Sequence, residues 1–179
     1  MKITQVRNAT LLIEFAGQRF LVDPMFADKE STPPFPGTPN GEKRNPLVDL
    51  PFPKSALVDV DCVILTHLHR DHWDDAAAEA IPKDIPMFVQ DQADAQKVRA
   101  QGFRRVEVLG TQQEFNGVSL SKTAGQHGSD EAIAKIGDRL GQVCGVVFSA
   151  PHEQRLYIVG DTLWNDDVRA SLEKHKPGV

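Results

Sequence analysis

Cysteine is scarce in this sequence. Cys62 and Cys144 are its only two cysteines in 179 residues, and both lie within apolar segments typical of buried strands. A disulfide framework is therefore not expected, and two buried, reduced thiols are the usual interpretation. A catalytic cysteine is also disfavoured, because a reactive thiol needs an accessible and electropositive setting.

Long apolar segments are absent as well. No uninterrupted run approaches the roughly 20 residues that span a bilayer, and the first eight residues lack the apolar stretch of a secretory signal. We therefore expect a cytoplasmic protein with no membrane partner. The length fits one ordinary domain with its own core, so we expect residues 1–179 to form a single domain.

Positive charge is in deficit. The sequence has 25 acidic and 20 basic residues, which gives a net charge of −5, and the basic residues form no continuous block. A protein that holds nucleic acid on a broad positive surface is therefore disfavoured, although a nuclease with a small local basic patch stays open.

Proline is concentrated in one segment. Eight of the 12 prolines lie between Pro24 and Pro53, so residues 24–53 can form neither a regular helix nor a central strand. Because this long loop connects two predicted core strands, we expect it to form a lid or rim near the functional site, with a solvated surface loop as the alternative. The candidate substrate contacts in it are Phe26, Phe35, Lys43 and Arg44.

The rest of the sequence alternates between strand-like and helix-like patterns, which predicts helices that cover a sheet. Strands are predicted at residues 2–7, 10–15, 18–23, 60–65, 86–89, 105–109, 142–149 and 155–159, with a hairpin around 113–120. Helices are predicted from residue 75, with Asp74 as the N-cap, and at 92–101 and 166–176. Residues 129–141 are expected to be irregular, with one short helix at most.

The segment that follows the strand ending at Leu65 contains three of the six histidines. In an extended backbone alternate side chains share a face, so His67, His69 and Asp71 can approach a common ion. His72 breaks this alternation and can join them only if the chain turns into the helix that follows. Imidazoles and a carboxylate suit zinc and are acceptable to manganese or iron. A polar loop that is rich in histidine by chance is the alternative.

Three further polar residues lie just after predicted strands. His127 is flanked by glycines that permit close backbone approach, but a lone histidine is more often structural. Asp161 can reach toward cations from a strand end, with an Asx turn or a helix cap as the alternative. Asp23 is a candidate acceptor for the N–H of an imidazole ligand, with a turn aspartate as the alternative.

The pattern His67-x-His69-x-Asp71-His72 after an apolar strand resembles the signature of the metallo-β-lactamase superfamily, whose members use two metal ions to hydrolyse esters, lactones, amides or phosphodiesters. The patterns at 9–14 and 19–24 further resemble the N-terminal hairpin of the branch that includes the ascorbate-6-phosphate lactonases. This resemblance implies an α/β protein with a four-layer α/β/β/α sandwich and metals at strand ends.

The resemblance also implies a set of metal ligands. His67, His69 and His127 would hold one ion, Asp71 and His72 would belong to the second, and Asp161 would bridge the two. Zinc is the expected metal, manganese is the alternative, and Asp71 is also the expected catalytic residue, since it would orient the attacking water.

The expected function is that of a metal-dependent hydrolase. Two cations leave a local excess of positive charge, which favours a small anionic substrate such as a lactone, ester or phosphoester. The alternatives are a nucleic-acid phosphodiesterase on the same metal site and a non-catalytic metal-binding protein. The substrate itself does not follow from the motif.

One departure from the family concerns the second metal site. In the family that site is completed by a further histidine, which lies beyond the position where this sequence stops. The only histidine of this sequence after Asp161 is His175, and it lies in a charged helical segment with no reason to face the ions. We therefore expect Met1–Val179 to represent only part of the functional protein, without the C-terminal portion of the family fold. Prepared alone, it should bind at most one metal tightly, show little hydrolysis, expose an unpaired sheet edge, and form homo-oligomers or aggregates.

Overall fold

The computed structural model describes residues 1–34, 37 and 39–179 of the chain, and its larger sheet combines an antiparallel and a parallel half. The antiparallel half is a meander of β1 (Lys2–Arg7), β2 (Thr10–Phe15) and β3 (Gln18–Val22). The parallel half adds β4 (Cys62–Leu65), β5 (Met87–Val89) and β6 (Val106–Val108) next to β3. The predicted strands are therefore confirmed, with ends that shift by a residue or two.

The smaller sheet is antiparallel, in the order β10-β9-β8-β7. Its strands are β7 (Gln113–Phe115), β8 (Val118–Ala124), β9 (Cys144–Ser149) and β10 (Leu156–Ile158). The backbone N–H of Tyr157 donates to the carbonyl of Val179 at 3.0 Å, and that of Gly178 donates to the carbonyl of Arg155 at 2.9 Å. The expectation of an unpaired edge is therefore wrong for this part of β10, which the last two residues cover.

Five helices connect the strands in the described part of the chain. They are α1 (Lys54–Leu57), α2 (Asp75–Ala80), α3 (Gln92–Ala100), α4 (Asp130–Leu140) and α5 (Asp166–His175). Asp74 is the N-cap of α2, as predicted, because its carboxylate accepts the N–H of Ala77 at 2.7 Å. None of the helices in the described residues combines the length and the apolar character that a bilayer crossing needs.

Residues 129–141 are more regular than predicted, because the short helix allowed there extends over most of the segment. They form α4, with a kink at Ile136 and with Ser129 as the N-cap, whose side chain accepts the N–H of Ala132. No residue of α4 is buried, and both Ile133 and Ile136 are exposed. The helix therefore packs little of its surface against the rest of the described structure.

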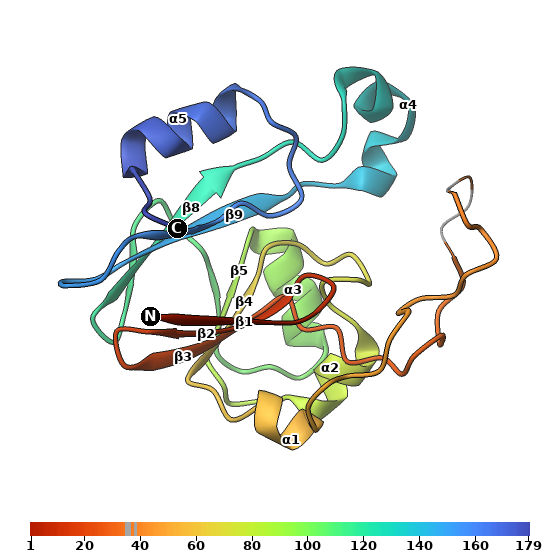
Figure 1. Ribbon diagram of the computed structural model, residues 1–179, viewed down its shortest axis with the longest axis horizontal. Coiled ribbons are helices and arrows are strands. Elements are labelled where there is room, and N and C mark those ends of the chain that lie inside the picture. Colours follow the sequence, from red (N-terminus) through yellow and green to blue (C-terminus); the bar gives the residue numbers. More distant parts are fainter. Residues whose placement is uncertain (35–36, 38) are drawn as a thin grey trace.

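The molecule has four layers, and alternation along β4 shows how they form. Val63 and Leu65 pack into a core shared with α1, α2 and α3, whereas Cys62 and Ile64 pack into a second core between the two sheets. On the outer face of the smaller sheet α5 lies against β8 (Figure 1). The predicted α/β/β/α sandwich is confirmed.

The proline-rich loop has no helix or strand in residues 24–34, 37 and 39–53, apart from a β-bridge between Thr32 and Asn45. Phe26 is completely buried in the core beneath the helices, so its prediction as a substrate contact is wrong. The guanidinium of Arg44 donates to the carbonyls of Glu30 and Ser31 within the loop. Phe35, another predicted contact, lies outside the described residues.

Candidate metal centre

The histidine motif begins at the carboxyl end of β4 and turns sharply after two residues. The backbone N–H groups of His72 and Trp73 both donate to the carbonyl of His69, at 2.9 and 2.8 Å. This turn brings His72 back toward His67, and their ring centroids are 4.0 Å apart. The turn that the sequence required for His72 to join the site is therefore present.

The structure brings five of the six predicted ligands into two groups that share one member. Ligand atoms of His67, His69 and His127 lie within 4.8 Å of one another, and so do those of His67, His72 and Asp161. The Oδ2 atom of Asp161 lies 3.2 Å from Nε2 of His72 and 3.6 Å from Nε2 of His127. The carboxylate of Asp161 therefore lies within reach of both groups.

Asp71, the sixth predicted ligand, lies at the edge of the second group. Its Oδ2 atom is 4.0 Å from Nε2 of His72, and its side chain is about one-third exposed at 34%. The carboxylate is thus close to the centre and open to a small molecule or water. The two remaining histidines lie elsewhere: His152 occupies a turn with a φ of 65°, and His175 ends α5.

Backbone carbonyls at the end of α4 fix two of the imidazole rings. Nε2 of His69 lies 3.0 Å from the carbonyl oxygen of Arg139, and Nδ1 of His127 lies 2.9 Å from that of Leu140. Each of these nitrogens donates its hydrogen, which leaves Nδ1 of His69 and Nε2 of His127 with lone pairs for a cation. The sequence did not reveal these partners, because a carbonyl is common to every residue.

A buried carboxylate fixes His72 in the same way. Oδ2 of Asp23 accepts the Nδ1 hydrogen of His72 at 2.9 Å and the hydroxyl of Thr66 at 2.6 Å, while Oδ1 accepts the N–H of Thr66 at 2.7 Å. The proposed role of Asp23 as an acceptor for an imidazole N–H is therefore confirmed. Nε2 of His72 is left for a cation on the side of Asp161.

His67 provides the clearest sign that the site suits a metal. Its Nε2 atom is buried and has no hydrogen-bond partner among the described residues. An unpaired buried nitrogen is costly unless something binds it. Three imidazoles on one side, and an imidazole with carboxylates on the other, form the nitrogen and oxygen ligand set that zinc prefers and manganese accepts. The residues therefore fit divalent cations.

The protonation states of these side chains are set by burial and by the ion pairs. Burial lowers the pKa of His67 to about 3, with help from the nearby His72 and His69, so its ring is neutral. Burial opposes protonation of His72, but hydrogen bonds with Asp161 and Asp23 outweigh it and raise its pKa to about 10. His72 must therefore lose a proton before its Nε2 can bind a cation.

The two carboxylates beside His72 differ in their surroundings. The hydrogen bond from His72 lowers the pKa of Asp161 to about 2, so this carboxylate is ionised. Burial raises the pKa of Asp23, while its hydrogen bonds with His72 and Thr66 act in the opposite direction.

The position before Asp161 requires glycine for a structural reason. Gly160 has a φ of 74°, and a Cβ atom there would lie 2.5 Å from the carbonyl oxygen of Cys144. Only glycine fits such a close approach in this conformation. On the other side, the hydroxyl of Thr162 accepts the N–H of Gln126 at 2.8 Å and thereby holds the segment that carries His127. Both neighbours of Asp161 thus help to place the ligands.

Comparisons with known proteins agree on the family. A family model described as "Beta-lactamase superfamily domain" matches residues 18–176. The UPF0173 protein YddR of Bacillus subtilis (strain 168) is 46% identical, over 100% of this chain and 70% of YddR. The isothiocyanate hydrolase from Delia radicum gut bacteria is 48% identical with a TM-score of 0.95, over 99% of this chain and 69% of that one.

A second solved structure is similar to the same extent. The possible metal-dependent hydrolase from Veillonella parvula DSM 2008 is 42% identical with a TM-score of 0.95, over 98% of this chain and 68% of that one. The chain therefore spans between two thirds and 70% of the length of these relatives.

Proposed function

Because this chain belongs to the beta-lactamase superfamily and is a metal-dependent hydrolase, we propose that it uses two divalent cations to cleave a small anionic substrate, such as a lactone, ester or phosphoester. Zinc is the first choice of metal and manganese the second. We further propose that the protein acts in the cytoplasm and does not act on nucleic acid.

The observation that carries this proposal is the set of oriented imidazoles. His69, His72 and His127 each have one nitrogen held by the protein, and the buried Nε2 of His67 has no partner in the described structure. Such rings present their remaining nitrogens to a common centre before any cation arrives, so binding needs little rearrangement. Cations bound there supply Lewis acidity and a water whose pKa lies near neutrality.

Two carboxylates have separate roles in this proposal. Asp161 lies between the two groups of ligands and would contact both cations. Asp71 is 4.0 Å from Nε2 of His72 and partly exposed, so it can accept a hydrogen bond from the attacking water and orient it. It can then pass a proton to the leaving group.

The anionic substrate is supported by charge. Two divalent cations together with the carboxylates of Asp71 and Asp161 leave a net positive centre, which attracts a phosphate or carboxylate group despite the negative charge of the whole chain.

The likeness to the isothiocyanate hydrolase favours a second candidate substrate, since it covers nearly the whole chain at 48% identity. Water adds to the central carbon of an isothiocyanate, R–N=C=S, to give a thiocarbamate, which then releases the amine R–NH₂ and carbonyl sulfide. This reaction requires the same oriented water and the same proton transfer to nitrogen that Asp71 would provide.

A substrate panel on zinc-loaded and manganese-loaded protein tests the proposal. For protein in which the second metal site is complete, we expect turnover of at least one lactone, ester, phosphoester or isothiocyanate, and a loss of about 100-fold or more in kcat for Asp71→Asn. Met1–Val179 prepared alone is still expected to show little hydrolysis. Affinity for an inert analogue should fall much less. Asp75→Asn, an exposed carboxylate nearby on α2, is the matched control and should keep full activity.

Two outcomes would contradict the proposal. Protein that binds the cations and turns over none of these compounds would be a non-catalytic metal-binding protein. Turnover confined to DNA or RNA would identify a nucleic-acid phosphodiesterase on the same site. Equal losses in kcat and in binding for Asp71→Asn would show that this residue only positions the substrate.

A further inference from the structure

A cavity of about 390 Å³ lies directly beside Asp71. Asp71 belongs both to the lining of this cavity and to the edge of the second ligand group, where its Oδ2 is 4.0 Å from Nε2 of His72. A substrate whose reactive carbon lies at the centre can therefore extend its remaining atoms into this space. The volume is within the range of pockets that hold small molecules.

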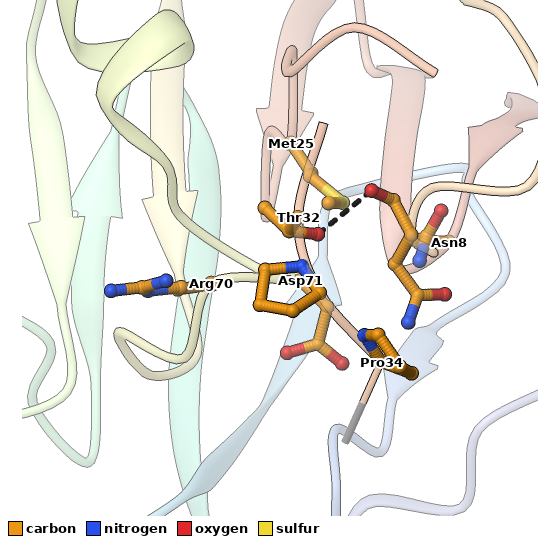
Figure 2. A pocket seen from close by; sticks show the side chains of 8 residues that line it. Asn8, Met25, Thr32, Pro34, Arg70 and Asp71 are labelled. Carbon is orange, nitrogen blue, oxygen red and sulfur yellow. Dashed lines mark hydrogen bonds between the residues drawn. The ribbon is translucent and has the colours of Figure 1, made fainter. Parts of the chain in front are cut away.

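The walls of the cavity are mostly neutral. Met25, Pro33 and Pro34 provide apolar surface, and neutral side chains of Asn8, Thr32 and Asn45 provide the polar part. The hydroxyl of Thr32 already donates to the carbonyl of Asn45 at 2.8 Å, as the dashed line in Figure 2 shows. The lining thus offers apolar contact together with the neutral side-chain amides of Asn8 and Asn45.

Among the described residues that line the cavity, only Arg70 and Asp71 are charged. Figure 2 shows that the side chain of Arg70 is directed away from Asn8 and Thr32, and Arg70 is exposed to solvent. Asp71 therefore contributes the charge nearest to the reacting centre, and it is negative. An anionic substituent would lose solvation against the mostly neutral walls of this cavity and would lie more favourably at the cations, whereas a neutral substituent has no such cost.

Buried hydrogen bonds hold the two ends of the proline-rich loop in place, including Met25 in the cavity wall. The guanidinium of Arg7, itself only 4% exposed, donates to the carbonyls of Met25, Ala27 and Val48, at 2.9, 2.7 and 3.0 Å. It thus ties both ends of the proline-rich loop to β1. A cavity whose walls are fixed in advance binds its ligand with a smaller entropic loss.

A second cavity, of about 260 Å³, lies on the other side of the centre but has a different character. It is lined by His67 and His69 and by the charged side chains of Asp94, Lys97 and Asp138, among others. An apolar substituent there would cover charged groups and remove their solvation. The cavity beside Asp71 is the better of the two for an apolar group.

We propose that the cavity beside Asp71 binds an uncharged, apolar substituent of the substrate, and that any anionic group of the substrate lies at the cations instead. This inference rests on the proposed function, because it takes the metal centre as the reacting end. It narrows the substrate to a compact electrophile with a neutral alkyl or aryl group, such as an isothiocyanate or an alkyl ester or lactone.

Binding of alkyl hydroxamates to the zinc-loaded chain tests this inference without requiring turnover. The hydroxamate group chelates the metal and directs its alkyl chain into the neighbouring space. By calorimetry we expect hexanohydroxamate to bind at least about tenfold more tightly than acetohydroxamate, because its additional methylenes are buried. A hydroxamate of the same length that ends in a carboxylate should lose at least that gain, because its charge would lose solvation against the mostly neutral walls.

Two variants locate the alkyl chain. Pro33→Trp should fill the cavity and abolish the gain in affinity from chain length. Asn8→Asp adds a second negative charge to the lining at partial exposure. It should therefore weaken binding of the carboxylate-ended hydroxamate further, by about threefold or more. Gln112→Asp adds the same charge at an exposed position outside both cavities and is the matched control. Zinc content confirms that each variant retains its metal centre.

The outcomes separate this inference from the proposed function. Affinity that does not depend on chain length, or a chain-length gain that Pro33→Trp leaves intact, would overturn the inference even if hydrolysis occurs. A chain-length gain that Pro33→Trp removes, with no hydrolysis of any substrate in the panel, would uphold the cavity as a binding site and reject the proposed function.

Discussion

Replacing Asp23 with asparagine should weaken one metal site and leave the other largely intact. Asp23 is 2% exposed, and its carboxylate accepts three hydrogen bonds, from Nδ1 of His72 and from the N–H and hydroxyl of Thr66. Asparagine has almost the same shape, and it tolerates the φ of 47° at this position. The substitution therefore changes hydrogen bonding with little change in packing or backbone strain.

The effect on His72 follows from the tautomer of its ring. If the amide nitrogen of asparagine replaces Oδ2, a donor faces the Nδ1 hydrogen, and the ring must move that hydrogen to Nε2. Nε2 is the atom that faces Asp161 and the second cation. We expect the affinity of the second metal site to fall about 10–100-fold. Loss of a hydrogen bond to a buried charged group should also lower the free energy of unfolding by about 1.5–3 kcal/mol.

Zinc titration against a competing chelator, combined with urea denaturation, measures both effects. The site formed by His67, His69 and His127 should keep its affinity within about threefold, since none of its rings contacts Asp23 in the described structure. Asp61→Asn is the control, because Asp61 also accepts a backbone N–H, that of Arg19 at 2.8 Å, but lies at an exposed position. Unchanged affinities at both sites, or equal losses at both, would refute the reasoning.

Three further predictions concern the ligands, the backbone and the thiols. His67→Ala should remove most bound zinc, because His67 belongs to both ligand groups, while circular dichroism shows a folded chain; unchanged metal content would contradict this. Gly160→Ala should lower the free energy of unfolding by about 1–3 kcal/mol, because of the φ of 74° and the 2.5 Å contact of its Cβ with Cys144; a urea midpoint equal to that of the parent would contradict it. Burial raises the pKa of Cys144 to about 12 and that of Cys62 further. Neither thiol should therefore react with iodoacetamide at pH 8 until urea unfolds the protein. Rapid labelling of the native chain would show instead that the thiols are accessible.

Much of the site could be predicted from the sequence because the ligands are side chains at strand ends. The apolar run before Thr66 predicted β4, whereas only the structure shows that Val63 and Leu65 face the helices and that Cys62 and Ile64 face the other sheet. Local backbone geometry then carries the histidine motif to the carboxyl end of that strand.

The tertiary structure decided how those ligands are oriented. Carbonyls of Arg139 and Leu140, about 70 and 13 residues away from the imidazoles they hold, select which nitrogen of His69 and His127 remains free. A carbonyl group is identical in every residue, so no residue type in the sequence marks it. The helix that supplies these carbonyls, α4, buries none of its residues.

The same distinction applies to the proline-rich loop. Its proline content alone predicted that residues 24–53 form neither helix nor strand, since proline lacks the N–H that both structures require. The position of the loop beside Asp71 depends on the buried guanidinium of Arg7, which reaches Met25 and Val48 across 18 and 41 residues of chain. Sequence determines which groups are able to make such contacts, but only the folded chain brings them within hydrogen-bond distance, because that distance depends on the packing of every layer between them.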